Sequence, residues 1–219
     1  MEDTYRHKGL RRQLIDELRD KGIKDESVLT VMNLLPRHFF LESAFEELAY
    51  SDKAFPIDND QTISQPYTVA YMTSLLEVRK KQKILEIGTG SGYQAALLGI
   101  LGARVYTVER QEILFKKSKE ILKNLGLPSV KCFFRDGSMG LPDFEPYDRI
   151  IVTAGIISTT IPEELKQQLA IGGIMVTPVG NSKSQKMYKI IRHDVDTFEE
   201  IATDTFRFVP FLKGVNKIN

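Results

Sequence analysis

The sequence predicts an α/β protein with a doubly wound, mostly parallel sheet. Apolar strands alternate with amphipathic helical segments from residue 84 to residue 178, and a glycine-rich turn joins the first strand to its helix. At the end of the chain, residues 186–192 and 200–209 have β patterns with no helix between them. We therefore expect antiparallel strands at one end of the sheet.

Three helices are expected before the sheet begins. Apolar residues recur at helical spacing within residues 5–21, and Gly22 ends that helix. Asp25 can cap a second helix, which Pro36 ends. A third helix begins at Pro66, because proline is tolerated in the first helical turn. These helices form an N-terminal elaboration of the fold.

Residues 37–64, between the second and third helices, show poor periodicity and contain polar turns. A long irregular segment in a compact domain is more often a functional loop or lid than filler. Peripheral packing is the alternative for this segment.

Strands and helices then alternate through the rest of the chain. The expected strands are 84–88, 104–109, 129–134, 148–154 and 173–178, and the expected helices are 92–101, 111–124 and 162–169. This alternation implies helices on both faces of a parallel sheet. We expect a single domain over residues 1–219, with the N-terminal helices and irregular segment in 1–80 and the sheet in 81–219.

The composition is that of an ordinary globular protein. Of 219 residues, 42% are hydrophobic and 27% charged, and the formal net charge is +1. No apolar run reaches the roughly 20 residues that a membrane span needs, and the mixed charges provide no broad field for nucleic acid. Residues 1–8 do not resemble a signal peptide, and the single cysteine, Cys132, fits a reducing compartment. We expect a monomeric, cytoplasmic protein without a nucleic-acid or membrane partner.

Gly88, Gly90 and Gly92 alternate in the turn after the first strand of the sheet. Glycines let a ligand approach the backbone, and the free amides of the following helix then face it. An ordinary tight turn is the alternative, but Glu86 precedes the turn and Glu109 ends the next strand, where such folds bind ribose hydroxyls. The glycine spacing differs from the dinucleotide fingerprint. A nucleoside with a cationic tail fits both acids, which indicates S-adenosyl-L-methionine.

Two further groups of residues follow strands of the predicted sheet. Asp136-Gly137 and Thr153-Ala154-Gly155 stand at carboxyl ends of strands, where ligands bind in open α/β sheets. Asp136 could accept a hydrogen bond from an adenine amino group. An Asp-Gly turn is an equally common interpretation.

The histidines do not indicate a metal site. His7, His38 and His193 are not clustered at metal-ligand spacing. We expect a tail or surface residue, a residue beside the core and a strand-end residue, respectively. The motifs of zinc proteases, phosphate loops and α/β-hydrolases are also absent from the sequence.

A polar run, Asp60-Gln61-Thr62-Ile63-Ser64-Gln65-Pro66, stands where the irregular segment meets the third helix. From the residues alone, helix capping by Ser64 or Gln65 is slightly favoured over a role in a site.

Two motifs together resemble the protein-L-isoaspartate O-methyltransferase family: residues 61–66, Gln-Thr-Ile-Ser-Gln-Pro, and residues 85–94, Leu-Glu-Ile-Gly-Thr-Gly-Ser-Gly-Tyr-Gln. The resemblance implies the fold of class I S-adenosylmethionine-dependent methyltransferases. It also implies an enzyme that methylates the α-carboxyl group of L-isoaspartyl residues in damaged peptides and proteins, with S-adenosyl-L-homocysteine as product. The similarity extends over nearly the whole chain, through residues 22–23, 28–29, 36–40, 72–73, 152–154, 172–173, 178–180 and 207–210.

The resemblance implies a role for each matching residue. Ser64 becomes the active-site residue, the three glycines support the methionine part of the cofactor, Glu109 binds its ribose, and Asp136 binds its adenine end. The candidate cofactor-binding residues are Glu86, Gly88, Thr89, Gly90, Ser91, Gly92, Glu109, Asp136 and Gly137, and the candidate substrate-binding residues are Thr62, Ile63, Thr153, Ala154 and Val209. No metal is expected.

The chain also departs from the family pattern. Asp58 and Asp60 stand where relatives usually have glycines, Arg135 precedes Asp136, and the loop 155–160 is longer and less proline-rich. Two added acids could weaken binding of an anionic acceptor. The alternatives are therefore a methyltransferase for a different carboxylate and a non-catalytic, cofactor-dependent binder of damaged proteins. A nicotinamide oxidoreductase is disfavoured by the glycine spacing.

Overall fold

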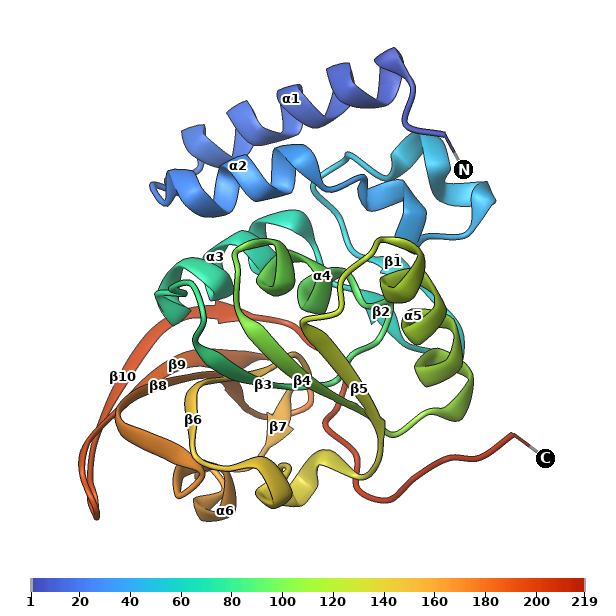
Figure 1. Ribbon diagram of the computed structural model, residues 1–219. Helices are drawn as coiled ribbons and strands as arrows, with labels where there is room; N and C mark the ends of the chain where they lie inside the picture. The colour runs from blue at the N-terminus through green and yellow to red at the C-terminus, as the bar shows by residue number, and fades with distance from the viewer. Residues whose placement is uncertain (1, 219) are drawn as a thin grey trace.

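A computed structural model describes residues 2–218 and contains a central twisted sheet covered by helices (Figure 1). The strand order is β10-β9-β8-β6-β3-β4-β5, with β7 paired to β8. The parallel strands are β3 (Lys83–Ile87), β4 (Arg104–Glu109), β5 (Val130–Phe134), β6 (Tyr147–Val152), β7 (Ile156–Ile157) and β8 (Leu169–Gly180).

The C-terminal strands β9 (Gln185–Asp194) and β10 (Thr197–Phe206) run antiparallel to their neighbours. This confirms the antiparallel strands expected at one end of the sheet. The chain passes from β3 outward to β4 and β5, and then crosses to β6 on the other side of β3. Ligands of open α/β sheets bind outside the carboxyl ends of the strands at such a reversal.

The helices are unequally distributed between the two faces. Figure 1 shows α3 (Pro66–Leu76), α4 (Tyr93–Ile100) and α5 (Glu112–Asn124) over one face and the short α6 (Glu163–Lys166) at the other. Successive residues of a strand face opposite sides, so Ile84 belongs to the core under the helices whereas Leu85 belongs to the second core. The predicted α/β architecture is confirmed.

The N-terminal helices form a further layer outside α3 and α4 (Figure 1). The side chain of Thr4 caps α1 (Tyr5–Asp20) through the amide of His7. Asp25 caps α2 (Glu26–Leu34), as the sequence predicts, by accepting hydrogen bonds from two amides of its first turn.

Short elements divide the irregular segment. They are the 3₁₀ helices η1 (Arg37–Phe40) and η2 (Ser43–Leu48) and the two-residue strands β1 (Phe55–Pro56) and β2 (Thr62–Ile63). β1 and β2 pair antiparallel, and at the tip of this hairpin Asn59 and Asp60 both adopt a φ of 55°. The hairpin brings the polar run toward the carboxyl edge of the sheet.

Two predicted boundaries are wrong. The helix expected over 162–169 covers only α6, because Leu169 already pairs with Tyr147 as the first residue of β8. The last strand ends at Phe206 rather than at residue 209, because its register shifts after Ala202 and the amide of Phe208 donates instead to the side chain of Gln185. Within residues 2–218, no helix is both long and apolar enough to cross a membrane.

Candidate active site

A pocket lies at the carboxyl ends of β3, β4 and β6, where the strand order reverses. One side, here called the cofactor wall, is residues 87–91 and 108–110, and the facing side, the acceptor wall, is residues 61–64 and 209–212. The space between protein atoms in the pocket is about 910 Å³, part of it open to solvent.

Gly88 lies in the part of the cofactor wall that packs most closely against Thr153. Its φ is +98°, and a Cβ atom there would lie 2.5 Å from Oγ1 of Thr153. The Thr153 hydroxyl lies against this turn, 2.6 Å from the carbonyl oxygen of Gly88 and 3.0 Å from that of Ile87. Only glycine fits between the end of β3 and the end of β6 without displacing one of them.

The carboxylate of Glu109 is fixed at the end of β4 by backbone amides. Oε2 accepts a hydrogen bond from the amide of Gly90 at 2.8 Å, and Oε1 accepts one from the amide of Gln111 at 2.8 Å. Burial raises the pKa of Glu109, whereas these amides oppose the rise. A carboxylate has about four lone-pair positions, so both oxygens can still accept hydrogen bonds from a ligand.

Glu86, predicted at the cofactor, is not part of the pocket lining. Strand alternation turns its side chain to the face of the sheet opposite that of Ile87, and both carboxylate oxygens are buried without a hydrogen-bond partner among residues 2–218. Burial raises the pKa of Glu86 to about 8, and nearby Glu109 adds to the rise. Glu86 is therefore a buried residue of β3 rather than a residue of the pocket lining.

Gly92 and Asp136 also lie outside the lining. A Cβ at Gly92 would lie 3.2 Å from Cβ of Ser118, so this glycine permits close packing of α4 on α5. Asp136 accepts hydrogen bonds from the amides of Ser138 at 2.8 Å and Gly214 at 2.6 Å. These contacts resemble the Asp-Gly turn considered from the sequence, and the next residue, Gly137, does line the pocket.

Ser64 lies in the acceptor wall, between β2 and the first turn of α3. The capping role considered for Ser64 or Gln65 is filled by Asp52: Gln65 makes no side-chain capping bond, and the amide of Tyr67 donates to Oδ1 of Asp52 at 2.7 Å. Asp52 also binds Lys21 and Gln65, at 2.7 and 2.9 Å. The start of α3 is therefore held by a buried side chain from the irregular segment.

The remaining predicted residues are brought together at the pocket. The lining includes Thr62, Ile63, Ser64, Gly88, Thr89, Gly90, Ser91, Glu109, Gly137, Thr153, Ala154 and Val209. Ala154 is followed by Gly155, whose amide donates to the carbonyl of Val209 at 2.8 Å. This bond closes the acceptor wall against the end of β6.

Several lining residues were not among the sequence candidates. They are Gln61, Val69, Met72, Ile87, Tyr93, Gln94, Val108, Arg110, Pro210, Phe211 and Leu212. Four of these residues, Gln61, Ile87, Tyr93 and Gln94, belong to the motifs at residues 61–66 and 85–94 and could have been predicted on that ground. Val69 and Met72, by contrast, belong to the apolar face of α3 and carry no sequence signal that separates them from core residues.

A second cavity adjoins the pocket and shares Thr62, Ser64, Thr153 and Val209 with it. Its other walls include Tyr67, Thr68, Lys183, Phe206, Arg207 and Phe208. Ser64 thus stands at the boundary of two cavities.

Two of the departures from the family pattern have ionic partners. Oδ2 of Asp58 lies 2.7 Å from Nζ of Lys117, and Nη1 of Arg135 lies 2.6 Å from Oδ2 of Asp143. Asp60 is exposed at the tip of the hairpin. Since Asp58 is paired, the excess negative charge near the pocket mouth is smaller than the sequence suggests.

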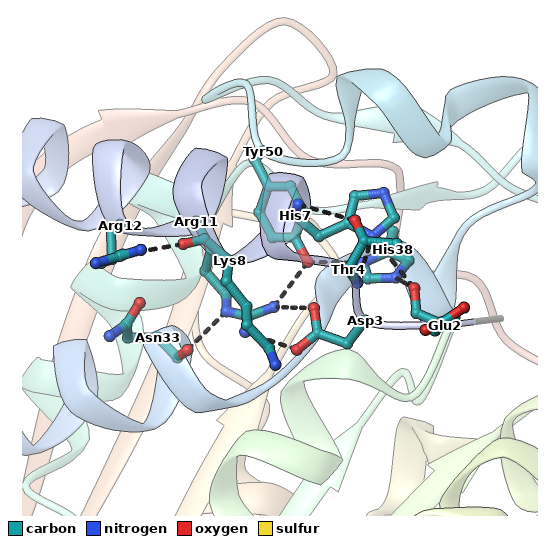
Figure 2. A network of polar contacts seen from close by, with 10 residues as sticks. All are labelled: Glu2, Asp3, Thr4, His7, Lys8, Arg11, Arg12, Asn33, His38 and Tyr50. Carbon is teal, nitrogen blue, oxygen red and sulfur yellow. Dashed lines mark hydrogen bonds and ion pairs between the residues drawn. The ribbon is translucent and has the colours of Figure 1, made fainter.

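The prediction for His7 is wrong, because this residue is buried and lies against His38 with 3.9 Å between ring centroids. Figure 2 shows the polar network around the pair. Ligand atoms of Asp3, His7 and His38 lie within 4.8 Å of one another, as a metal site would require. However, Arg11 binds both carboxylate oxygens of Asp3 at 3.0 Å, so a cation there would meet a guanidinium.

The network instead joins the N-terminus to η1. Nδ1 of His38 lies 2.7 Å from the hydroxyl of Tyr50, and Arg11 donates to the same hydroxyl at 3.0 Å and to the carbonyl of Asn33 at 2.6 Å (Figure 2). Burial lowers the pKa of His38, and the neighbouring His7 lowers it further. His193, by contrast, is exposed near the end of β9, as expected, and lies 2.9 Å from Glu199.

The sheet order, the glycine turn and the buried carboxylate at the end of β4 define a class I methyltransferase. A family model for protein-L-isoaspartate(D-aspartate) O-methyltransferase matches residues 9–216. The chain belongs to this family. It is 51% identical over 216 residues to protein-L-isoaspartate O-methyltransferase of Christiangramia forsetii and 53% identical over 216 residues to that of Flavobacterium psychrophilum, in each case over 99% of this chain and 100% of the relative.

Solved structures agree with this fold. A structure of a protein-L-isoaspartate O-methyltransferase superimposes with a TM-score of 0.81 at 28% identity, over 91% of this chain and 65% of that one. A Plasmodium falciparum protein, solved with S-adenosyl-L-homocysteine, gives a TM-score of 0.82 at 23% identity, over 93% and 99% of the two chains.

Proposed function

We propose that this chain transfers a methyl group from S-adenosyl-L-methionine to the α-carboxyl group of L-isoaspartyl residues. The resulting ester collapses to a succinimide, whose hydrolysis returns some normal aspartate. The proposal rests on one pocket whose lining contains both Ser64, on the acceptor wall, and the glycine turn of the cofactor wall. Family membership supports both the donor and the acceptor.

The cofactor wall fits the proposed donor. The turn at Gly88 packs against Thr153, a Cβ atom at Gly90 would have only Ile57 within 4 Å, and the fixed carboxylate of Glu109 can accept hydrogen bonds from ribose hydroxyls. Gly137 would border the adenine end, since it follows β5 and lines the pocket. When bound, the donor supplies an electrophilic methyl group on a sulfonium cation.

The acceptor wall needs to orient the substrate rather than to remove a proton. An α-carboxyl group has a pKa of about 3.5 and is already ionised at neutral pH, so no general base is required. We assign to Ser64 the role of holding this carboxylate by a hydrogen bond from its hydroxyl group. Alignment of two bound reactants can account for a large part of a rate enhancement.

Exclusion of water should assist the reaction. Attack of a carboxylate on a sulfonium disperses charge, so a poorly hydrated pocket favours the transition state over the separated ions. Ile63, Val209 and Phe211 supply apolar surface in the pocket lining. We assign to these side chains the task of excluding water around the reacting groups.

The second cavity is the proposed site for the peptide on either side of the isoaspartyl residue. It adjoins Ser64 and contains the aromatic side chains of Tyr67, Phe206 and Phe208. We also propose that the protein acts as a monomer in the cytoplasm, where its single cysteine would stay reduced. Burial raises the pKa of Cys132 to about 11, so little reactive thiolate forms at neutral pH.

The test is methyl transfer from labelled S-adenosyl-L-methionine to two peptides that differ only in one isoaspartyl or aspartyl residue. We expect base-labile label on the isoaspartyl peptide alone. Equal labelling of both peptides, or none, would refute the proposal. Label on another carboxylate in a substrate panel would favour a different acceptor, and binding of cofactor and peptide without transfer would favour a non-catalytic binder.

A further inference from the structure

Arg37, the first residue of η1, lies directly behind Ser64. Its side chain is 0% exposed, and Nη2 donates a hydrogen bond to the backbone carbonyl of Ser64 at 2.9 Å. The carbonyl of Lys53 lies farther away, at 3.5 Å from the same nitrogen. Neither Nε nor Nη1 has a hydrogen-bond partner among residues 2–218. The bond to Ser64 is thus the short one that this guanidinium makes within the described chain.

Removing a cation of this kind from water costs free energy unless paired charges or hydrogen bonds compensate. Burial lowers the pKa of Arg37 to about 10, which still leaves the group charged at neutral pH. The ring of Tyr93 lies under the guanidinium, with 5.2 Å from Cζ to the centroid. Asp52 contributes favourable charge, but its carboxylate oxygens bind Lys21, Gln65 and Tyr67. An apolar side chain of similar size would fill this space at lower cost.

Two buried side chains of the irregular segment therefore hold the peptide around Ser64 from opposite ends. Arg37 binds its carbonyl, and Asp52 binds the amide of Tyr67 in the first turn of α3. The backbone of η1 is itself anchored next to Arg37 by the contacts of His38 with His7 and Tyr50 (Figure 2). A displacement of Arg37 would move the serine that borders both cavities.

We propose that Arg37 is a positioning residue that fixes the backbone of Ser64 so that its hydroxyl group meets the acceptor carboxylate. The inference rests on the proposed function, because it assumes that Ser64 contacts the acceptor. Arg37 does not line the pocket itself, but it contacts two residues that do, the carbonyl of Ser64 and the ring of Tyr93, and the proposed role is exerted through Ser64. Its Nε and Nη1 atoms, which have no hydrogen-bond partner among residues 2–218, mark a guanidinium fixed by surrounding packing rather than by a complete hydrogen-bond network.

The first experiment compares Arg37→Met and Arg37→Lys with the wild type. A misplacement of about 1 Å can cost on the order of 100-fold in rate. We expect Arg37→Met to lower kcat for the isoaspartyl peptide by about 30-fold, and Arg37→Lys to recover part of this loss because an ammonium can reach the same carbonyl. Calorimetric affinity for S-adenosyl-L-homocysteine should change less than about twofold, since the cofactor wall is untouched.

Arg149→Met is the matched control. Arg149 is also buried and also donates to backbone carbonyls, at Leu76 and Glu77, but these stand at the other end of α3. This variant should lose thermal stability and keep the wild-type kcat. If Arg149→Met lost as much kcat as Arg37→Met, the loss would reflect a general structural effect, and the inference would be overturned.

A double-mutant cycle with Ser64→Ala separates positioning from general damage. If Arg37 acts through the Ser64 hydroxyl, Arg37→Met should cause little further loss in the Ser64→Ala background. An additive loss there, or an unchanged kcat in the single variant, would overturn the inference. Should Arg37→Met fail to fold, the cycle is made with Arg37→Lys.

A measurement that does not depend on methyl transfer distinguishes failure of the proposed function from failure of the positioning role of Arg37. Absence of methylation by the wild-type protein refutes the proposed function, whatever Arg37 does. Amide hydrogen exchange over residues 62–68 then tests the contact itself, because loss of the Arg37 bond should speed exchange in this segment. Exchange there as slow as in the wild type would overturn the positioning role.

Discussion

The two walls of the pocket are built in opposite ways. The cofactor wall comes from the turn after β3 and the end of the neighbouring strand β4, and its glycines and amides are fixed by neighbours in the sheet. The acceptor wall is the end of an irregular hairpin and the segment that follows β10. Around Ser64 this wall is held by two buried side chains distant in sequence, Arg37 and Asp52.

The two walls also differ in the charge and hydrogen bonding of the buried ionisable residue that lies behind each of them. Glu86 lies behind the cofactor wall with no hydrogen-bond partner among residues 2–218, and burial raises its pKa to about 8, which favours the neutral acid. Arg37 lies behind the acceptor wall and remains charged while it binds Ser64. The cofactor wall therefore depends on backbone shape, whereas the acceptor wall depends on specific side-chain bonds.

The largest effect should come from Gly88→Ala, which tests the dependence of the cofactor wall on shape. A left-handed conformation costs a non-glycine residue about 1–2 kcal/mol, and overpacking against Thr153 adds about 1–3 kcal/mol. If the turn moves to relieve this strain, affinity for S-adenosyl-L-homocysteine should fall by about 1,000-fold, equivalent to about 4 kcal/mol. Isothermal calorimetry measures the loss.

Gly22→Ala is the matched control for that change. Gly22 has a φ of +97°, but nothing lies within 4 Å of the position its Cβ would take. This variant should be destabilised and keep the wild-type cofactor affinity. Equal affinities for Gly88→Ala and the wild type would contradict the close fit of the turn.

Ser64→Ala tests the acceptor wall. We expect kcat for the isoaspartyl peptide to fall by about 100-fold, because the acceptor carboxylate loses its alignment. Affinity for S-adenosyl-L-homocysteine should stay within about twofold, since the hydroxyl belongs to the other wall. A large loss of cofactor affinity, measured by calorimetry, would contradict the separation of the two walls.

Glu86→Gln tests the buried acid behind the cofactor wall. Because folding raises the pKa of Glu86, the folded state binds more protons than the unfolded state, and stability should fall as pH rises from the ordinary glutamate pKa to about 8. At about 1.4 kcal/mol per pH unit, this group alone would remove roughly 2 kcal/mol between pH 6 and 7.5.

In denaturant unfolding at several pH values, Glu86→Gln should lose this part of the pH dependence and be more stable than the wild type near pH 8. Parallel profiles for the two proteins would show that Glu86 is ionised in the folded state or has an unassigned partner.

The smallest effect is expected from Asp58→Asn near the pocket mouth. Asp58 is paired with Lys117, and surface ion pairs contribute about 0–1 kcal/mol. The peptide KM should change by less than about twofold, whereas Asp60→Asn, at the exposed tip, should lower KM more. Steady-state kinetics at low and high salt compare the two variants. A larger fall in KM for Asp58→Asn would show that Lys117 does not compensate its charge.

The sequence predicts most of the elements because their signals are local. The alternation of apolar strands and helices, the cap at Asp25 and the glycine turn all depend on residues close in the chain. The helix expected over 162–169 failed because strand pairing between Leu169 and Tyr147 outweighed a local helical pattern. His7 was misplaced for a similar reason, since only folding brings it against His38.

By itself, the sequence determined the class of fold, the cofactor wall and, through two linked motifs, the family. Glycines at a turn indicate the backbone conformation directly, and the place of a carboxylate follows from the strand that it ends. The function of both can therefore be predicted from the sequence alone. Only the tertiary structure decided that Glu86 turns away from the pocket, that Asp52 rather than Ser64 caps α3, and that Arg37 binds the Ser64 carbonyl. These outcomes depend on burial and on contacts between distant residues, which no local pattern encodes.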